Sequence, residues 1–251
     1  MAGHPLADVE YPEGEMVPEG DLHTRRCGEL VFALRHWLAA RPGGDGAWVC
    51  DSMNVYYVEG DPRAVAAPDV AVAFGVDVDV LAGAGRYLVW EAGAAPAWVL
   101  EIASPATFRV DVVDKPAKYA AMGVVEYWRL DPHDGELFTP PLCGARRVGD
   151  RWAPIAVSAD GAGVLRGRSA VLGLDLCWQA PKLRLFDRVA GEWLLDPDDR
   201  LDAQRDAEAR ADDAEARAGR EAAARRAAET EVAELRRRLG LSAPPPSGAA
   251  E

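Results

Sequence analysis

Residues 97–119 read AWVLEIASPATFRVDVVDKPAKY, and this stretch predicts a buried strand with one charge inside it. The large apolar residues of the strand include Trp98, Leu100 and Ile102, and Glu101 lies among them. A carboxylate without a partner is costly to bury, so such a group is normally paired, protonated or bound to a cation. The role of Glu101 is therefore the first question that the sequence raises.

A second strand of the same design is predicted at APDVAVAFGV, residues 67–76. Side chains of a strand alternate between its two faces, so the bulky residues of each predicted strand share one face. The opposite face carries one carboxylate with small neighbours: Asp69 precedes Ala71 in this strand, and Glu101 precedes Ala103 in the other. If the two strands pair with these faces aligned, Asp69 and Glu101 converge.

Two converging carboxylates repel each other unless a cation lies between them. Oxygen ligands with room for water molecules suit a hard divalent ion, so the pattern predicts a site for Mg²⁺ or Mn²⁺. A short helix is expected at residues 111–123, DVVDKPAKYAAMG, and it places Lys115, Lys118 and Tyr119 along one side. A lysine beside a bound metal can orient a water molecule and stabilise the charge that develops on a phosphate.

Three segments in combination resemble a known family: PDVAV (68–72), EIASPAT (101–107) and DKPAKYAAMGVVEYWRLDP (114–132). They are similar to the Uma-type putative restriction-endonuclease family, a branch of the PD-(D/E)XK nuclease superfamily. The resemblance covers about residues 15–190. It implies a restriction-endonuclease-like fold and a metal-dependent endonuclease that hydrolyses phosphodiester bonds in DNA.

The resemblance also implies which residues hold the metal. Asp69 and Glu101 match the two acidic positions of the family, and the backbone carbonyl of Ile102 is the expected further ligand. Related nucleases can place an additional acidic or polar group on the first helix, where this sequence has His23 and Glu29.

The catalytic lysine departs from the usual pattern of the superfamily. Ala103 stands two residues after the second acid, where that lysine is normally found. In this branch the lysine is expected on the following helix, and Lys115 matches by its spacing to Tyr119. Lys118 is the competing candidate, one turn further along the same side of the helix.

The order of the predicted elements indicates an α/β (α+β) fold, with a mixed sheet flanked by helices. An N-terminal arm is expected over residues 1–20, and the endonuclease-like domain over residues 21–195. Residues 196–241 are dominated by Ala, Arg, Glu and Asp, which predicts a long exposed helix, either solitary or in a coiled coil. Residues 242–251 are expected to be a disordered tail.

Composition excludes some classes of protein. The net charge of −13 argues against a protein that coats DNA non-specifically, although it allows a nuclease with a local basic groove. No apolar run is long enough to span a membrane, no secretory signal is visible, and the four cysteines are scattered. A cytoplasmic protein with free thiols is therefore expected.

The favoured interpretation is a Mg²⁺- or Mn²⁺-dependent endodeoxyribonuclease, and two alternatives remain open. The first is a catalytically inactive module that binds nucleic acid or protein. The second is a scaffold that acts through the C-terminal helix, which could bind itself, as in a homodimer, or another protein.

Overall fold

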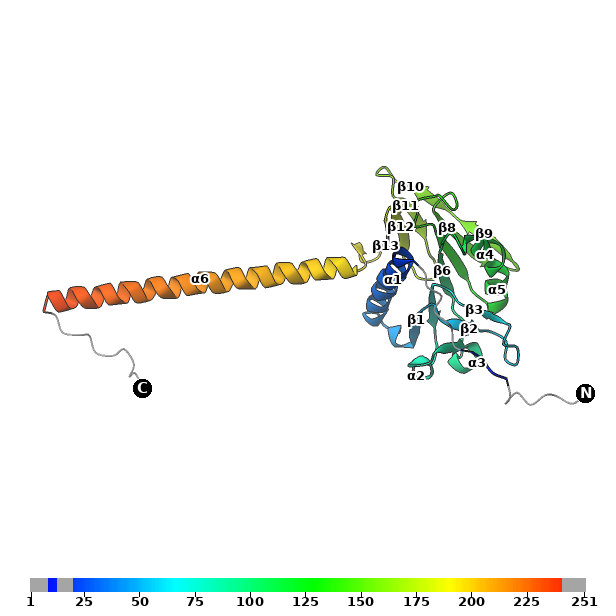
Figure 1. Ribbon diagram of the computed structural model, residues 1–251, viewed down its shortest axis with the longest axis horizontal. Coiled ribbons are helices and arrows are strands. Elements are labelled where there is room, and N and C mark those ends of the chain that lie inside the picture. The colour runs from blue at the N-terminus through cyan, green and yellow to red at the C-terminus, as the bar shows by residue number, and fades with distance from the viewer. Residues whose placement is uncertain (1–8, 13–19, 241–251) are drawn as a thin grey trace, which may run out of the picture. The chain divides into compact units, whose positions relative to one another are not determined.

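Strand β6 (Trp98–Ile102) lies inside a six-stranded mixed sheet with the order β1-β4-β6-β7-β8-β9 (Figure 1). The computed structural model of the protein describes residues 9–12 and 20–240. β6 and β7 are parallel, and the other neighbouring strands of this sheet are antiparallel. The remaining strands of the sheet are β1 (Ala47–Asp51), β4 (Val70–Phe74), β7 (Glu126–Leu130), β8 (Leu142–Val148) and β9 (Arg151–Ile155).

The two faces of this sheet separate two hydrophobic clusters, as the alternation of side chains predicts. The β4–β6 ladder pairs Val70 with Leu100 and Ala71 with Val99. Val70 and Leu100 belong to one cluster, whereas Ala71 and Val99 belong to the other. The predicted alignment of bulky and small faces is therefore confirmed.

The bulky face packs against helix α1 (Asp21–Ala39) and a second, antiparallel sheet of five strands, order β10-β11-β12-β13-β14. Asp187 in this second sheet accepts a hydrogen bond from Trp37 Nε1 of α1 at 3.1 Å and one from Arg41 Nη1, just after the helix, at 2.8 Å. The strands are β10 (Val157–Ala159), β11 (Leu165–Arg168), β12 (Asp175–Gln179), β13 (Lys182–Asp187) and β14 (Glu192–Trp193).

The small-residue face packs against helix α5 and a three-stranded sheet of order β3-β2-β5. Helix α4 lies directly before α5 in the chain, and the two are in contact. The elements not yet given are η2 (Gly44–Gly46), β2 (Asn54–Tyr56), β3 (Val65–Ala66), α2 (Val78–Leu81), β5 (Arg86–Leu88), α3 (Val89–Ala92), α4 (Phe108–Val113) and α5 (Lys115–Met122).

The helix expected after β6 differs from the structure. The single helix expected at 111–123 is instead two helices, because α4 ends before Asp114 and α5 begins at Lys115, with Pro116 in its first turn. After Asp51 the chain leaves the large sheet for the small one, so that β1 and β2 belong to different sheets. The Gly- and Ala-rich connection between β4 and β6, residues 75–95, contains α2, β5 and α3.

Glu126 joins the large sheet to the turn between β11 and β12. Its fully buried carboxylate accepts hydrogen bonds from Ser169 Oγ at 2.6 Å and from the Ala170 amide at 2.9 Å. Arg146 on β8 donates to the same carboxylate through Nε and Nη2, at 3.1 and 2.8 Å. Trp128 Nε1 is a further donor at 3.3 Å. Glu126 therefore has a structural role that its hydrogen bonds explain.

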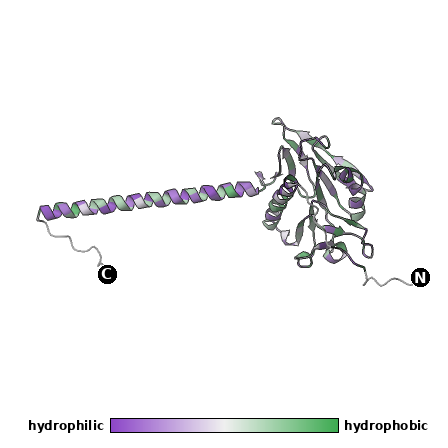
Figure 2. Ribbon diagram, viewed as in Figure 1, coloured by the Kyte–Doolittle hydropathy of each residue, from purple (hydrophilic) through white to green (hydrophobic). Residues whose placement is uncertain are grey.

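The chain after Pro197 forms a separate compact unit. Helix α6 (Pro197–Arg238) has 42 residues, and none of them is buried. Hydrophilic residues predominate along it, with scattered hydrophobic positions (Figure 2). Residues 242–251 of the expected tail, and residues 1–8 and 13–19 of the expected arm, lie outside the described residues. In the described part of the chain, no helix is long and apolar enough to cross a membrane.

Candidate active site

Asp69 and Glu101 occupy facing positions at the end of the β4–β6 ladder. The ladder pairs Val70 with Leu100, so its continuation by one residue places Asp69 opposite Glu101. Both are buried, with 8% and 1% of their surface exposed. Asp69 Oδ2 accepts a hydrogen bond from the Ile102 amide at 2.6 Å, and His23 Nε2 of α1 lies 3.0 Å from the same oxygen.

Helix α5 supplies two partners to Glu101. Lys115 Nζ donates to Glu101 Oε2 at 2.6 Å, and the Tyr119 hydroxyl donates to Oε1. The ring of Tyr119 packs against that of Tyr127 on β7, with 5.1 Å between the ring centroids. Glu101 is therefore held by one cation and one hydroxyl group, both from the helix that the sequence places after the strand.

Asp111 on α4 is a third buried carboxylate of this cluster, and the sequence-based reasoning missed it. It is 1% exposed, and Lys115 Nζ lies 3.0 Å from its Oδ1. Neither of its carboxylate oxygens has a hydrogen-bond partner of good geometry. The available signal was the spacing of four residues between Asp111 and Lys115, which places both side chains on one side of a helical segment.

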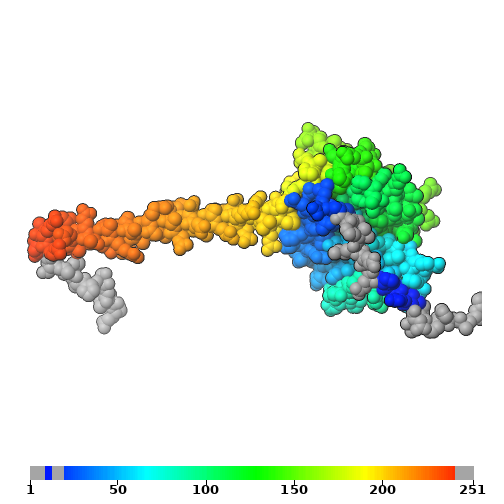
Figure 3. Space-filling model, viewed as in Figure 1, coloured from blue at the N-terminus to red at the C-terminus, as the bar shows by residue number. Residues whose placement is uncertain are grey.

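The turn after β6 brings α4 and α5 back over the sheet. Ser104 Oγ lies 2.9 Å from Thr107 Oγ1 and accepts a hydrogen bond from the Thr107 amide at 3.2 Å. α4 then carries Asp111, and α5 starts at Lys115. Gly123, with a φ of 98°, ends α5 in the left-handed conformation that favours glycine. In Figure 3 the surfaces of α1 (blue) and of the α4–α5 region (green) are both visible on the face of the first unit that is drawn.

Burial and charge act on the three carboxylates in different ways. Burial, reinforced by the charge of Asp69, raises the pKa of Glu101 well above its ordinary value, although Lys115 opposes this. Burial also raises the pKa of Asp111 against the opposing charge of Lys115. Burial acts in the same direction on Asp69, but His23, Lys115 and the Ile102 amide outweigh it and lower the pKa of Asp69. The ionised forms of Glu101 and Asp111 are therefore less well stabilised than that of Asp69, and a nearby cation would stabilise them more.

Lys115 remains charged in this environment. Burial alone would lower the pKa of its ammonium group, but the charges of Glu101, Asp111 and Asp69 outweigh burial and raise it. The side chain is 18% exposed, so the ammonium group lies at the edge of the buried cluster. Lys115 therefore keeps its positive charge beside three carboxylates.

Two of the candidate residues are not brought to this cluster. Lys118 is exposed, and its Nζ donates to the Val65 carbonyl at 3.1 Å. Glu29 forms ion pairs with Arg25 and Arg26 of its own helix. Its position, six residues after His23, lies on a different side of α1. The structure thus brings together Asp69, Glu101, Lys115, Tyr119, His23 and the amide of Ile102.

The donor chemistry of the cluster fits a hard divalent cation. Asp69, Glu101 and Asp111 offer buried carboxylate oxygens, and Asp111 Oδ1 has Lys115 Nζ at 3.0 Å as an ion-pair partner. Such oxygens are the ligands that Mg²⁺ and Mn²⁺ prefer. In the described residues, no three His, Cys, Asp or Glu side chains already converge in the arrangement of a metal site. Lys115, which lies between Glu101 and Asp111, is the cation that these two carboxylates contact.

Comparison with known proteins identifies one family. The model of the family described as "Uma2: Putative restriction endonuclease" matches residues 2–197. No curated protein matches the chain. The chain is also similar to a crystal structure described as a putative nuclease belonging to DUF820 from Anabaena variabilis ATCC 29413. The two are 17% identical with a TM-score of 0.40, over 61% of this chain and 80% of that one.

Proposed function

The chain belongs to the Uma2 family of putative restriction endonucleases, and from this premise we propose that it is a metal-dependent nuclease that hydrolyses phosphodiester bonds in DNA. One observation carries the proposal: Asp69, Glu101 and Asp111 are buried together beside the ammonium group of Lys115. A stable fold does not require three buried carboxylates at one place, and perturbed carboxylates of this kind gather at catalytic centres.

Asp69 and Glu101 would hold Mg²⁺ or Mn²⁺, with the carbonyl of Ile102 as a further ligand. When bound, the divalent ion supplies Lewis-acid polarisation of the phosphate and a lowered pKa for the attacking water. Tyr119 fixes one oxygen of Glu101, and the Ile102 amide fixes one oxygen of Asp69. These contacts hold both carboxylates in place before the substrate arrives, so that little reorganisation accompanies the reaction.

Lys115 and His23 act on either side of these ligands. The ammonium group of Lys115 can donate a hydrogen bond to the attacking water or to a phosphate oxygen, where negative charge develops during hydrolysis. His23 lies 3.0 Å from Asp69 Oδ2 and lowers the pKa of that carboxyl, which keeps Asp69 ionised. His23 is therefore a positioning residue for Asp69 in this proposal.

One observation favours the alternative of a catalytically inactive binding module. Lys115 contacts both Glu101 and Asp111, so part of the buried charge is already neutralised without a metal. A module that had lost its metal could keep this cluster as an internal ion-pair network. The two functions differ in whether a divalent ion is needed for any reaction on DNA.

Removal of divalent ions tests the proposal directly. We expect the full chain to nick or cleave supercoiled plasmid DNA with Mg²⁺ or Mn²⁺, to be inactive in excess EDTA, and to recover when Mn²⁺ is restored. The readout is plasmid conversion on agarose gels, with single-stranded DNA and RNA oligonucleotides as parallel substrates. No metal-dependent cleavage of any of these substrates would favour the binding module.

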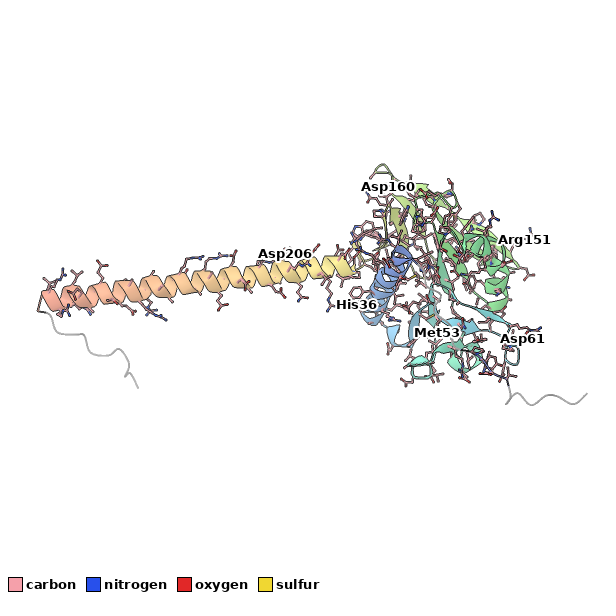
Figure 4. The ribbon with its side chains drawn as sticks, viewed as in Figure 1. His36, Met53, Asp61, Arg151, Asp160 and Asp206 are labelled. Carbon is pink, nitrogen blue, oxygen red and sulfur yellow. The ribbon has the colours of Figure 1, made fainter. Side chains whose placement is uncertain are left out.

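We further propose that α6 associates with a second copy of the chain as a parallel coiled coil. Ala228, Val232, Leu235 and Leu239 recur at spacings of four, three and four residues, as in a coiled-coil seam. The last three are 46%, 50% and 71% exposed, although they are the large apolar residues of this helix end. The side chains of α6 project outwards along its length, that of Asp206 among them (Figure 4).

The flanking charges support the parallel orientation of this coiled coil. With Val232 and Leu235 in the seam, Glu231 and Arg236 occupy the two flanking positions that face each other between parallel helices. Each copy would then offer a glutamate to the arginine of the other. An in-register pair of chains would also bring two sites into one assembly, which would let them act on the two strands of DNA.

Leu235→Asp is expected to convert a dimer into a monomer, because a carboxylate in the seam must be desolvated. Sedimentation velocity of the full chain measures the change in mass. Thr230→Asp is the matched control, since residue 230 faces away from the seam and this variant should remain dimeric. A wild-type chain that sediments as a monomer at tens of micromolar would contradict self-association through α6.

A further inference from the structure

Lys115 is the cation that contacts two of the three buried carboxylates. Its Nζ lies 2.6 Å from Glu101 Oε2 and 3.0 Å from Asp111 Oδ1. Glu101 and Asp111 are each 1% exposed, and Asp69 is 8% exposed. Three formal negative charges therefore share one buried region with one ammonium group, and a close ion pair in such a region is strong because water screens it poorly.

We propose that the ammonium group of Lys115 competes with the divalent ion for Glu101, and that Asp111 receives Lys115 when the ion binds. This inference rests on the proposed function, because it concerns the same metal. A divalent ion that takes Glu101 Oε2 must displace the contact of Lys115 at 2.6 Å. The affinity for the metal then depends on how much more strongly Glu101 binds the divalent ion than the ammonium group of Lys115.

The contacts around Glu101 allow this exchange without loss of the carboxylate position. Tyr119 donates to Oε1, whereas Lys115 donates to Oε2, so only one of the two oxygens changes its partner. Lys115 has a flexible four-carbon chain and is 18% exposed, so its ammonium group lies at the edge of the cluster. The side chain of Glu101 can thus keep its place while its cation is exchanged.

Asp111 has the capacity to receive the displaced ammonium group. Its Oδ1 is already 3.0 Å from Lys115 Nζ, and neither of its oxygens has a hydrogen bond of good geometry. A small movement of the ammonium group would give it a full hydrogen bond there. The lysine would remain beside the metal and the substrate, so Asp111 is a positioning residue for Lys115.

The inference predicts opposite effects for two neighbouring substitutions. Lys115→Met removes the competitor and should tighten Mn²⁺ binding at least about tenfold, while cleavage is lost. Asp111→Asn removes the negative charge that would hold the displaced ammonium group and should weaken Mn²⁺ binding several-fold. Lys118→Met, on the same helix but bonded to the Val65 carbonyl, is the matched control and should keep the wild-type affinity.

Isothermal titration calorimetry with Mn²⁺ measures these affinities in the full chain, first at low salt and then in 0.5 M NaCl, a concentration chosen to screen exposed charges. Direct competition at a buried contact predicts that the tightening by Lys115→Met persists at high salt. Thermal unfolding with and without Mn²⁺ verifies folding, and Lys115→Met should gain more stability from the ion than the wild type.

The outcomes separate this inference from the function on which it rests. If the wild type binds Mn²⁺ and Lys115→Met binds it no more tightly, the competition is refuted while the metal site stands. Tightening that vanishes in 0.5 M NaCl would also refute direct competition. If neither protein binds Mn²⁺, the proposed metal-dependent function fails.

Discussion

Glu101→Gln is expected to abolish the binding of Mg²⁺ and Mn²⁺ and to reduce DNA cleavage on the order of 10²–10³-fold, while the protein stays folded. The amide keeps an oxygen that can accept the hydrogen bond from Tyr119, so the side chain keeps its place. It lacks the negative charge that a divalent ion requires. Lys115 keeps a partner in the variant, because Asp111 Oδ1 lies 3.0 Å from its ammonium group.

The same substitution should leave the free energy of unfolding unchanged or raise it at neutral pH. Burial and the charge of Asp69 raise the pKa of Glu101 in the folded protein above its unfolded value, which is about 4.3. At a pH below both values Glu101 is protonated in both states, and the variant and wild type should be equally stable. As the pH rises through the folded pKa, the wild type must ionise a buried group and loses stability relative to the variant.

Urea unfolding across the pH range measures this difference, and plasmid cleavage measures the loss of activity. Glu136→Gln is the control, because Glu136 is exposed and should affect neither property. Full cleavage by a folded Glu101→Gln protein would remove Glu101 from the active site.

Glu126→Ala is expected to show the reverse pattern, with a loss of stability of about 3–5 kcal/mol. The substitution removes the acceptor for Ser169 Oγ, the Ala170 amide and Arg146, and leaves buried donors without partners. The cost arises mainly from these unsatisfied groups. Because Glu126 has no contact with Lys115 or Asp69 among the described hydrogen bonds and ion pairs, the metal site should keep its affinity for as long as the variant is folded.

Chemical denaturation of Glu126→Ala and wild type at pH 7 gives the change in stability, and Mn²⁺ titration below the unfolding transition gives the affinity. Glu192→Ala is the control, since Glu192 is exposed on β14. A loss below about 1 kcal/mol would mean that the described network contributes little, because surface substitutions commonly fall in that range.

The two glutamates show what the sequence can and cannot predict. Strand alternation predicts that Asp69 and Glu101 share faces with the small residues of their strands, because a period of two residues is a local property of the chain. The same local pattern contains no signal that separates Glu101 from Glu126. What distinguishes them is the set of neighbours: Ser169 and Arg146 come from distant parts of the sequence and satisfy Glu126.

Three further features of the structure also depend on neighbours that are distant in the sequence or on tertiary packing, and the sequence did not predict them. A break between α4 and α5 depends on how the chain packs on the sheet, and the apolar periodicity of residues 108–122 does not reveal it. Asp111 was missed because the helix containing it was expected to begin there, where an aspartate is usually a cap. The docking of the five-stranded sheet against the bulky face has no local sequence signal, since it depends on long-range contacts.

The central claim is that Asp69 and Glu101 share one divalent ion, and anomalous diffraction from crystals of the protein soaked in Mn²⁺ tests it most directly. We predict a single strong anomalous peak at this cluster, in contact with a carboxylate oxygen of Asp69 and of Glu101. Glu101→Gln crystals treated in the same way should lack it. The claim is contradicted if the soaked wild-type crystals show manganese bound elsewhere and none between these two carboxylates.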